Sequence, residues 1–386
     1  MRSLRVCALL AVMAVFAPQP LPASAAQEPA VRVAIFQEAE GARLTIPVPC
    51  RVTDLQGKLL VEWPDLKWQE VRPVRQGLAI GRWESALDAV ALELAPGAIF
   101  YVNARPYRGG LILRRTKQGR LTVINRLPLE EYLVGALTSE VSAAWPLEAL
   151  KAHAVVSRTM AAHRIWIRKG QEFDMTADTS THLYHGVSAE RGRTREAAEA
   201  TRGQVLAYEG ELFSASFHAS CGGHTEDAAE LWATKRRIPP LSGVEDPYCR
   251  NLKHYRWTAA IPEQEFLLRL GQEAGEIGAL KSIEVEANRS GRARILRLLG
   301  DRGSMKLTGR QLREKLGANR LRSLKFTVTV RPGQVLFEGF GWGHGVGFCQ
   351  WGAYGMARQG KTSDQILQFY FPGAQRRMLK GLPGFS

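Results

Sequence analysis

Cysteine, acidic residues and long apolar segments are all scarce in this chain of 386 residues. Five cysteines are too few for a small scaffold held together by disulfides. The composition, with 45% hydrophobic residues, also excludes a disordered or collagen-like chain. The length is sufficient for two domains, or for one large domain with an appendage.

Acids number only 37 against 52 lysines and arginines, which gives a net charge of +15. Such a balance favours anionic partners, namely nucleic acid, acidic lipid or an anionic polymer of the cell wall. The charge alone does not distinguish among these three classes.

Only the N-terminus carries an extended apolar run. Arg2 and Arg5 precede the run Val6–Phe16, and Ala-Ser-Ala at 23–25 offers a small-residue cleavage site. This layout is typical of a secretory signal peptide, and eleven apolar residues are fewer than the roughly 20 that a membrane-spanning helix needs. We therefore expect residues 1–25 to be removed, leaving a chain of charge +13 without a transmembrane segment. It would be exported to the periplasm, cell wall or medium, where nucleic acid is not an expected partner.

The pattern of the remaining chain predicts an α+β fold. Residues 26–125 contain short, partly alternating runs rich in Val, Ile and Leu, which predict a β-rich N-terminal region. Residues 126–374 predict a mixed α/β domain, and 375–386 a C-terminal tail. Its first helix begins near Leu127, and its second runs from Pro146 to Gly170. Further helices are expected at 194–201, 308–316 and 363–369, with strands at 205–208, 213–218, 324–330 and 335–338.

Glu140 is the first candidate for catalysis. The sequence Leu-Thr-Ser-Glu-Val-Ser at 137–142 predicts a loop between the two helices, with apolar neighbours that include Val141 and Trp145. Desolvation raises the pKa of a carboxyl held against apolar groups, because it penalises the charged form. A carboxylic acid protonated near neutral pH is what a general acid for glycosidic cleavage requires. The alternative is an exposed loop or capping glutamate.

Arg158 is the second candidate. It follows Ala154 by four residues, on or beside the apolar face of the second predicted helix. A buried guanidinium needs an anionic partner, and either Glu140 or a substrate carboxylate would serve. A purely structural ion pair is the alternative.

Four cysteines remain after cleavage of the signal peptide: Cys50, Cys221, Cys249 and Cys349. Their pairing is not readable, since four cysteines allow three pairings. Because an exported protein meets an oxidising compartment, we place a Cys221–Cys249 disulfide first. A metal bound by these two cysteines and His224 comes second, since the spacing matches no standard zinc module.

The segment Phe-His-Ala-Ser-Cys-Gly-Gly-His-Thr at 217–225 also permits a binding role. A Gly-Gly turn would present Ser220 and a histidine, His218, to a ligand. The cruder rival is a metal hydrolase built on His218, Cys221 and His224.

Alternating glycines between large aromatic residues mark the segment 339–352. The spacing of a phosphate-binding or dinucleotide-binding loop is not met. Trp342 and Trp351 offer flat apolar faces, and His344 and Gln350 offer hydrogen bonds, a combination that suits a sugar ring. A tightly packed structural turn is the alternative.

Together these segments resemble the stage II sporulation protein D family, the SpoIID/LytB group that includes amidase enhancers. The resemblance rests on residues 127–159, 183–190, 217–228, 244–249, 341–360 and 366–373, and spans about 107–373. It implies a lytic transglycosylase that cuts peptidoglycan glycan strands, preferentially strands stripped of stem peptides. The family's essential glutamate matches Glu140, and an arginine needed for activity matches Arg158.

The resemblance also shapes the expected partners and cofactors. Glycan strands are the expected substrate, with Trp342, His344 and Gln350 along the sugar groove, and Arg158 on Glu140 or on a lactyl carboxylate. An N-acetylmuramoyl-L-alanine amidase is the partner if the protein is instead a non-catalytic enhancer. Some relatives bind zinc before a triplet that corresponds to 182–184 here, but those ligands are missing. We therefore expect no metal at that place, and no cofactor.

Overall fold

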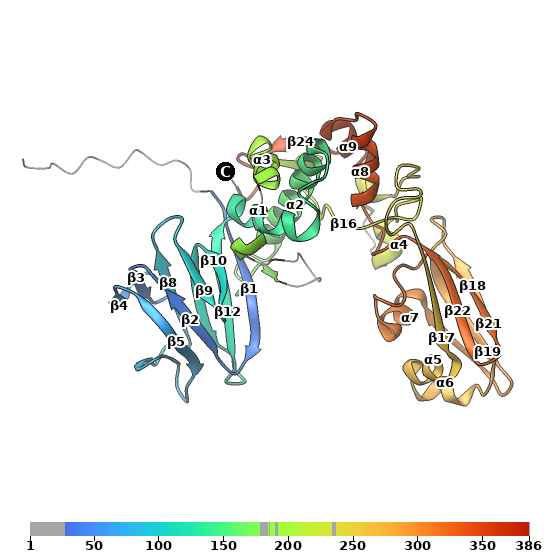
Figure 1. Ribbon diagram of the computed structural model, residues 1–386, viewed down its shortest axis with the longest axis horizontal. Helices are drawn as coiled ribbons and strands as arrows, with labels where there is room; N and C mark the ends of the chain where they lie inside the picture. Colours follow the sequence, from blue (N-terminus) through green and yellow to red (C-terminus); the bar gives the residue numbers. More distant parts are fainter. Residues whose placement is uncertain (1–27, 178–183, 185, 190–191, 234–236, 386) are drawn as a thin grey trace, which may run out of the picture.

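The computed structural model describes residues 28–177, 184, 186–189, 192–233 and 237–385. The predicted signal peptide and most of the segment 180–184 lie outside these residues. None of the helices in the described part is both long and apolar enough to cross a lipid bilayer. Strands and helices mix as an α+β fold with a β-rich N-terminal region, which confirms the predicted class. Figure 1 shows the N-terminal sheets, a helical centre and a second β-rich lobe following one another across the molecule.

Two sheets form the N-terminal region. The first has the strand order β13 (Met175–Thr176), β1 (Ala30–Ala39), β12 (Leu121–Pro128), β11 (Gly110–Arg115), β8 (Ala89–Leu94), β3 (Cys50–Thr53), β4 (Leu59–Trp63). The second has the order β10 (Arg105–Arg108), β9 (Ile99–Val102), β2 (Ala42–Ile46), β5 (Leu66–Pro73), β6 (Leu78–Ile80), β7 (Trp83–Ser85). Apolar side chains alternate into the core along these strands, as Ala42, Leu44 and Ile46 do on β2.

The helical centre shares its core with these sheets. It contains α1 (Leu129–Glu140), α2 (Leu147–Ile167), η1 (Gly186–Ala189), α3 (Gly192–Ala200), α8 (Gln350–Arg358) and α9 (Ser363–Tyr370). Leu129 and Tyr132 of α1, and Met160 of α2, belong to the same hydrophobic cluster as the inward residues of β1 and β12. The N-terminal region and the helices therefore pack as one body, without a linker at 125.

The long helix α2 is buried over most of its length. Every residue from Ala149 to Ala162 is buried except Lys151, which is half-buried. Around it lie the three-stranded sheet β15 (Glu211–Leu212), β14 (Gln204–Tyr208), β24 (Gln375–Met378) and the parallel pair β16 (Phe217–His218), β23 (Phe348–Cys349). Short helices α4 (Ala228–Trp232) and η2 (Pro239–Leu241) follow β16.

A second β-rich lobe is inserted between β16 and β23. Its sheets have the orders β17 (Arg256–Pro262), β22 (Gln334–Phe340), β21 (Phe326–Arg331) and β18 (Leu280–Ala287), β19 (Ala293–Gly300), β20 (Ser304–Thr308). Helices α5 (Glu263–Leu270), α6 (Gln272–Glu276) and α7 (Gly309–Leu316) belong to it. A separate hydrophobic cluster, with members from Trp257 to Phe337, fills this lobe. Residues 126–374 thus contribute to several hydrophobic clusters, and the one in this lobe is separate from the others.

The predicted C-terminal tail is part of the fold. Residues 375–378 form β24, which pairs antiparallel with β14 over four residues. Leu379 and Leu382 are buried in the N-terminal core. No local pattern marks this pairing, because Gln375–Met378 carries two arginines and all four of its residues are exposed.

Candidate functional site

Glu140 is the last residue of α1, rather than a loop residue as predicted. The helix continues because Thr138 and Ser139 donate hydrogen bonds to the carbonyls of Val134 and Gly135, four residues before each of them. The Thr138 hydroxyl is also 2.6 Å from that of Thr194 in α3, which anchors the last turn of α1. The side chain of Glu140 is half-buried.

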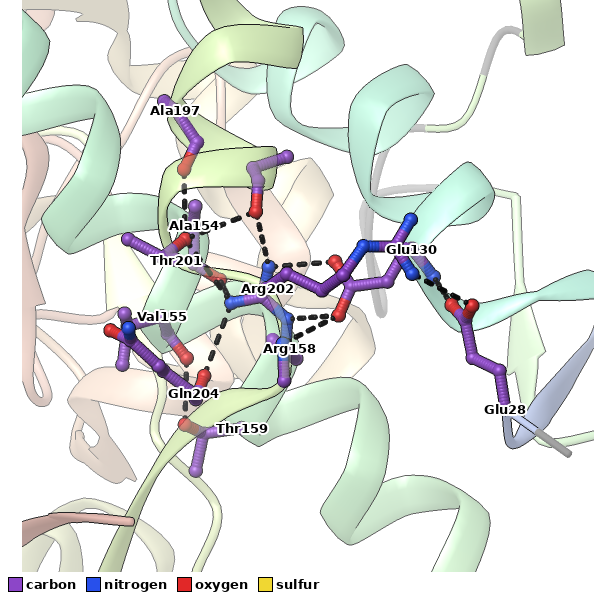
Figure 2. A network of polar contacts seen from close by, with 12 residues as sticks. Glu28, Glu130, Ala154, Val155, Arg158, Thr159, Ala197, Thr201, Arg202 and Gln204 are labelled. Carbon is purple, nitrogen blue, oxygen red and sulfur yellow. Dashed lines mark hydrogen bonds and ion pairs between the residues drawn. The ribbon is translucent and has the colours of Figure 1, made fainter. Parts of the chain in front are cut away.

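Arg158 pairs with Glu130, not with Glu140 (Figure 2). Its Nε and Nη2 atoms each donate to one carboxylate oxygen of Glu130, both at 2.7 Å. The arginine side chain is fully buried. The structural ion pair, the alternative weighed for Arg158, is therefore the arrangement in the structure.

The Arg158–Glu130 pair ties four elements together. Arg158 also donates to the carbonyls of Ala198 in α3 and Gln204 in β14, at 3.0 and 3.1 Å. Glu130 in the first turn of α1 accepts a further bond from the Gly203 amide. Since α1 carries Glu140 at its other end, Arg158 acts by fixing that helix against α2, α3 and β14. We regard it as a positioning residue.

The N-terminus of α1 is capped from a distant part of the chain. The residue at the cap position is Pro128, which has no side-chain hydrogen bond to offer. Instead the Glu28 carboxylate accepts the Glu130 amide at 2.7 Å and meets Arg202 at 3.1 Å (Figure 2). A carboxylate at the N-terminus of a helix stabilises it, because its negative charge interacts favourably with the helix dipole.

The glycine-rich segment 339–352 packs its backbone against segment 217–226. Ser220 and Trp342 exchange two backbone hydrogen bonds, and β16 pairs with β23. A Cβ atom on Gly341 would lie 2.5 Å from the Ser220 carbonyl oxygen, and one on Gly343 would lie 2.7 Å from the Cβ of His218. Both glycines also have positive φ. The glycines therefore permit close approach of two chain segments.

Three residues expected to bind substrate are buried inside this contact. The exposed fractions of His218, Ser220 and Gln350 are 4%, 1% and 6%. His218 donates from Nδ1 to the Val346 carbonyl, and Gln350 contacts the ring of His153. Because their side chains fill the interior, these three do not line a sugar groove in the structure.

Trp342 and Trp351 of the segment join two rings from other segments in a row, which we call the aromatic row. Trp145 in this row is buried, whereas Trp351, His254 and Trp342 are half-buried. The row starts at Trp145, five residues after Glu140, whose ring is 5.0 Å from that of Trp351. His254 continues the row, at 6.2 Å from Trp351 and 4.6 Å from Trp342. The row thus joins the end of α1 to the glycine-rich segment. No motif in the sequence marks His254 as a functional residue.

His344 lies apart from this row, in a cavity of about 290 Å³. Trp232 and the α7 residues Arg310, Arg313 and Glu314 also line the cavity. The Val346 amide donates to Nδ1 of His344 at 3.0 Å, so the proton of the neutral ring is on Nε2. The other ring nitrogen is therefore a donor, and the backbone of Phe217 is its hydrogen-bond partner.

Burial keeps two histidines of the site neutral. Desolvation lowers the pKa of His153 to about 3 and that of His344 to about 4. In the unfolded chain both would titrate near 6.5. As the pH falls below 6.5, the unfolded chain takes up protons that the folded protein does not, so stability is lost on acidification.

We expect the His153→Gln variant to be less sensitive to acid than the wild type. Between about pH 6 and 4, each neutral buried histidine costs about 1.4 kcal/mol of stability per pH unit. The variant should lose that contribution, which urea unfolding midpoints at several pH values would measure. If the unfolding midpoint fell with pH equally in the two proteins, His153 would not be neutral in the native state.

The cysteines do not form the predicted disulfide. Sγ of Cys221 and Sγ of Cys249 are 3.4 Å apart, and both cysteines are free thiols. Sγ of Cys349 and the Asp246 carboxylate lie beside them, whereas His224 is not in this group. Its ring nitrogen bonds the Thr225 carbonyl instead. The predicted trio of Cys221, His224 and Cys249 is therefore not assembled.

Comparison with known proteins gives two family models that match. Residues 117–208, which include Glu140 and Arg158, match the model for stage II sporulation protein, SpoIID. Residues 241–347, which include the inserted lobe, match a domain of unknown function, DUF8618.

Three relatives show how far the similarity extends. The chain is 33% identical to an uncharacterized protein of Brachyspira hyodysenteriae, over 78% of this chain and 79% of that protein. It is 30% identical to stage II sporulation protein D of Bacillus subtilis, over 65% of this chain and 75% of that one. It is 26% identical to the amidase enhancer of the same organism, over 62% of this chain and 39% of the longer relative.

Proposed function

Because the chain belongs to the stage II sporulation protein D family, we propose that it is an exported lytic transglycosylase of the cell wall. Its substrate is the glycan strand of peptidoglycan, stripped of stem peptides. The bond cut joins N-acetylmuramic acid to N-acetylglucosamine, and the product carries a 1,6-anhydro ring. The observation that carries the proposal is the aromatic row that begins five residues after Glu140.

Glu140 is the acid and the base of the proposed reaction. Its carboxyl proton goes to the oxygen that links the two sugars, and positive charge develops on the muramic ring. The resulting carboxylate then takes the proton of that sugar's C6 hydroxyl, whose oxygen closes the anhydro ring. Ordinary glycosidases need a second carboxylate to act as nucleophile or to activate water. An internal nucleophile removes that requirement.

The place of Glu140 suits a proton donor. It ends α1, whose last turn carries no basic residue to offset the partial negative charge of the helix C-terminus. The buried residues Val141 and Trp145 follow directly, which limits the access of water. Both features describe the half-buried position of this carboxyl at the end of α1.

The aromatic row provides the binding surface in this proposal. Rings of Trp351, His254 and Trp342 are half-buried, so each keeps an exposed part for the apolar face of a sugar. The guanidinium of Arg322 lies 4.7 Å from the ring centre of Trp342, and can meet a lactyl carboxylate at that end. The chain's positive charge favours adsorption to an anionic wall polymer.

We expect the Trp342→Ala variant to bind peptide-free glycan about tenfold more weakly than the wild type, because losing one stacking face costs roughly 1.4 kcal/mol. Trp68→Ala is the matched control, since Trp68 is 64% exposed on the N-terminal region, away from the row. Cosedimentation with purified glycan measures both. Equal weakening by the two substitutions would contradict the row as the binding surface.

Mass spectrometry of digested, peptide-free glycan tests the reaction itself. Anhydro ends and hydrolysed ends differ by the mass of one water, so the product class is read directly. We expect anhydro ends to accumulate with the wild-type protein alone. Hydrolysed ends would instead indicate a water-using glycosidase.

A non-catalytic amidase enhancer is the second candidate, because one relative bears that name. As an enhancer, the protein would bind the cell wall and a partner amidase without cutting the glycan strands. Binding to peptidoglycan by the wild type, with no sugar product and a stimulated N-acetylmuramoyl-L-alanine amidase, would favour it.

A further inference from the structure

Four buried side chains from three chain segments converge beneath the glycine-rich segment. Cys221 follows β16, Asp246 and Cys249 lie in the turns before the inserted lobe, and Cys349 ends β23. All four are fully buried. We call this group the cysteine cluster.

The ligand atoms of the cluster have the spacing of one coordination sphere. All four lie within 4.8 Å of one another. Sγ of Cys221 is 3.4 Å from Sγ of Cys249 and 3.1 Å from a carboxylate oxygen of Asp246. Ligands at Zn–S and Zn–O bond lengths around a tetrahedral ion are roughly 3.5–3.8 Å apart. Small shifts therefore suffice to bring the four atoms to bonding distance.

The number of sulfurs also favours a metal over a disulfide. A disulfide between Cys221 and Cys249 would use two thiols and leave Cys349 and the Asp246 carboxylate buried beside it. A divalent ion engages all four groups at once and offsets the charge that they would carry together. Thiolates select zinc among the common divalent ions, and zinc sites with four protein ligands are structural.

We propose that Cys221, Asp246, Cys249 and Cys349 bind one Zn²⁺ in a closed, four-ligand structural site. This set differs from the metal ligands weighed in the sequence, since Asp246 and Cys349 stand in place of His224. The site also differs from the zinc site that some relatives have before the triplet corresponding to 182–184, since its ligands come from other segments.

The surroundings of the cluster hold its ligands in place. The amides of Cys221 and Gly352 both donate to Sγ of Cys349 at 3.3 Å. The Tyr370 hydroxyl and the Tyr248 amide donate to the two oxygens of Asp246, at 3.0 and 2.8 Å. Such outer hydrogen bonds orient metal ligands and support their negative charge.

A buried guanidinium completes the surroundings. Arg292 of the inserted lobe is 1% exposed and donates to the carbonyls of Cys221 and His224. Its positive charge lies beside a site whose ligands, three thiolates and a carboxylate, outweigh the charge of one Zn²⁺. The lobe thereby contributes to the balance of charge at the site.

The position of the site gives it a mechanical role. Cys249 lies seven residues before β17, the first strand of the inserted lobe, and Cys349 nine residues after β22, its last. An ion bound to both joins the two ends of the lobe to the helical centre. Cys349 also caps α8, whose Trp351 belongs to the aromatic row. Loss of the ion should therefore make the position of Trp351 in the aromatic row less fixed.

Metal content and thiol counts on the purified full chain test the proposal without any glycan. We expect one zinc per chain by elemental mass spectrometry, and a Co²⁺-substituted protein with the visible absorption of a tetrahedral thiolate site. A strong chelator should release the ion, make three additional thiols reactive and lower the melting temperature. The proposed glycan activity plays no part in these measurements, so either proposal can fail alone.

Matched variants separate a built site from chance binding. Cys221→Ser should reduce the zinc content to near zero, while Cys50→Ser should retain one ion, because Cys50 is equally buried but lies in the N-terminal core. His224→Ala should also retain the ion. If Cys221→Ser does not fold, the wild-type stoichiometry and cobalt spectrum decide.

Three results would overturn the proposal. One is a metal-free protein whose mass is two hydrogens below the reduced chain, as a Cys221–Cys249 disulfide requires. Another is iron in place of zinc in the isolated protein. The third is a zinc content unchanged by Cys221→Ser, which would mark adventitious binding.

Discussion

Replacing Glu140 by glutamine should slow the formation of anhydro-ended sugars by a factor of about 10²–10⁴, the range that a positioned acid or base contributes. The amide keeps the shape of the side chain at the end of α1 but has no acidic proton to donate. In the proposed mechanism one residue serves first as acid and then as base, so both steps lose their catalyst. Mass spectrometry of peptide-free glycan over a time course would measure the effect.

The Glu199→Gln variant controls for a general effect of removing one negative charge. Glu199 is exposed on α3, so its replacement makes the same chemical change as Glu140→Gln but away from the end of α1. It should leave the rate of product formation unchanged. Binding of glycan should survive in both variants. An unchanged rate with Glu140→Gln would remove Glu140 from the mechanism.

Replacing Arg158 by methionine should destabilise the protein by about 3–5 kcal/mol, because the Glu130 carboxylate would be left buried without its partner. Chemical denaturation of the purified protein would measure the loss. An exposed pair provides the comparison, since Arg310 and Glu314 of α7 are both more than half exposed. Arg310→Met should cost less than about 1 kcal/mol.

A double variant separates the structural role of Arg158 from a catalytic one. Combining Arg158→Met with Glu130→Leu removes both buried charges, and apolar replacements of such pairs are often neutral or stabilising. The double variant should therefore recover most of the stability. If Arg158 acts only by positioning α1, product formation should recover with it. Restored stability without restored activity would instead point to a direct role in the reaction.

The strands of the N-terminal region were predictable because each has a local signal. Alternating apolar residues, separated by glycine, proline or charged residues, mark β1, β2, β8 and β9 in the sequence. The boundaries of α2 were close to those predicted, since Pro146 precedes it and Gly170 follows its last turn. Local composition determines these features.

The partners of the charged and sulfur-containing residues were not predictable in the same way. Glu130 and Arg158 are 28 residues apart and lie on different helices, so only the packing of α1 on α2 brings them together. Cys221 and Cys349 are separated by the whole inserted lobe. No local spacing carries information on such contacts. The placement of Glu140 in a loop failed for a smaller reason, because Thr138 and Ser139 weaken a helix on average but here bond back to it.

The pairing of β24 with β14 has a consequence for biosynthesis. Until residues 375–382 have been made, one edge of β14 has no neighbour and the space filled by Leu379 and Leu382 is empty. A growing chain therefore cannot reach its final compact form during translation. For the exported protein that we propose, this delay would keep the polypeptide extended, the form in which a secretion channel accepts it.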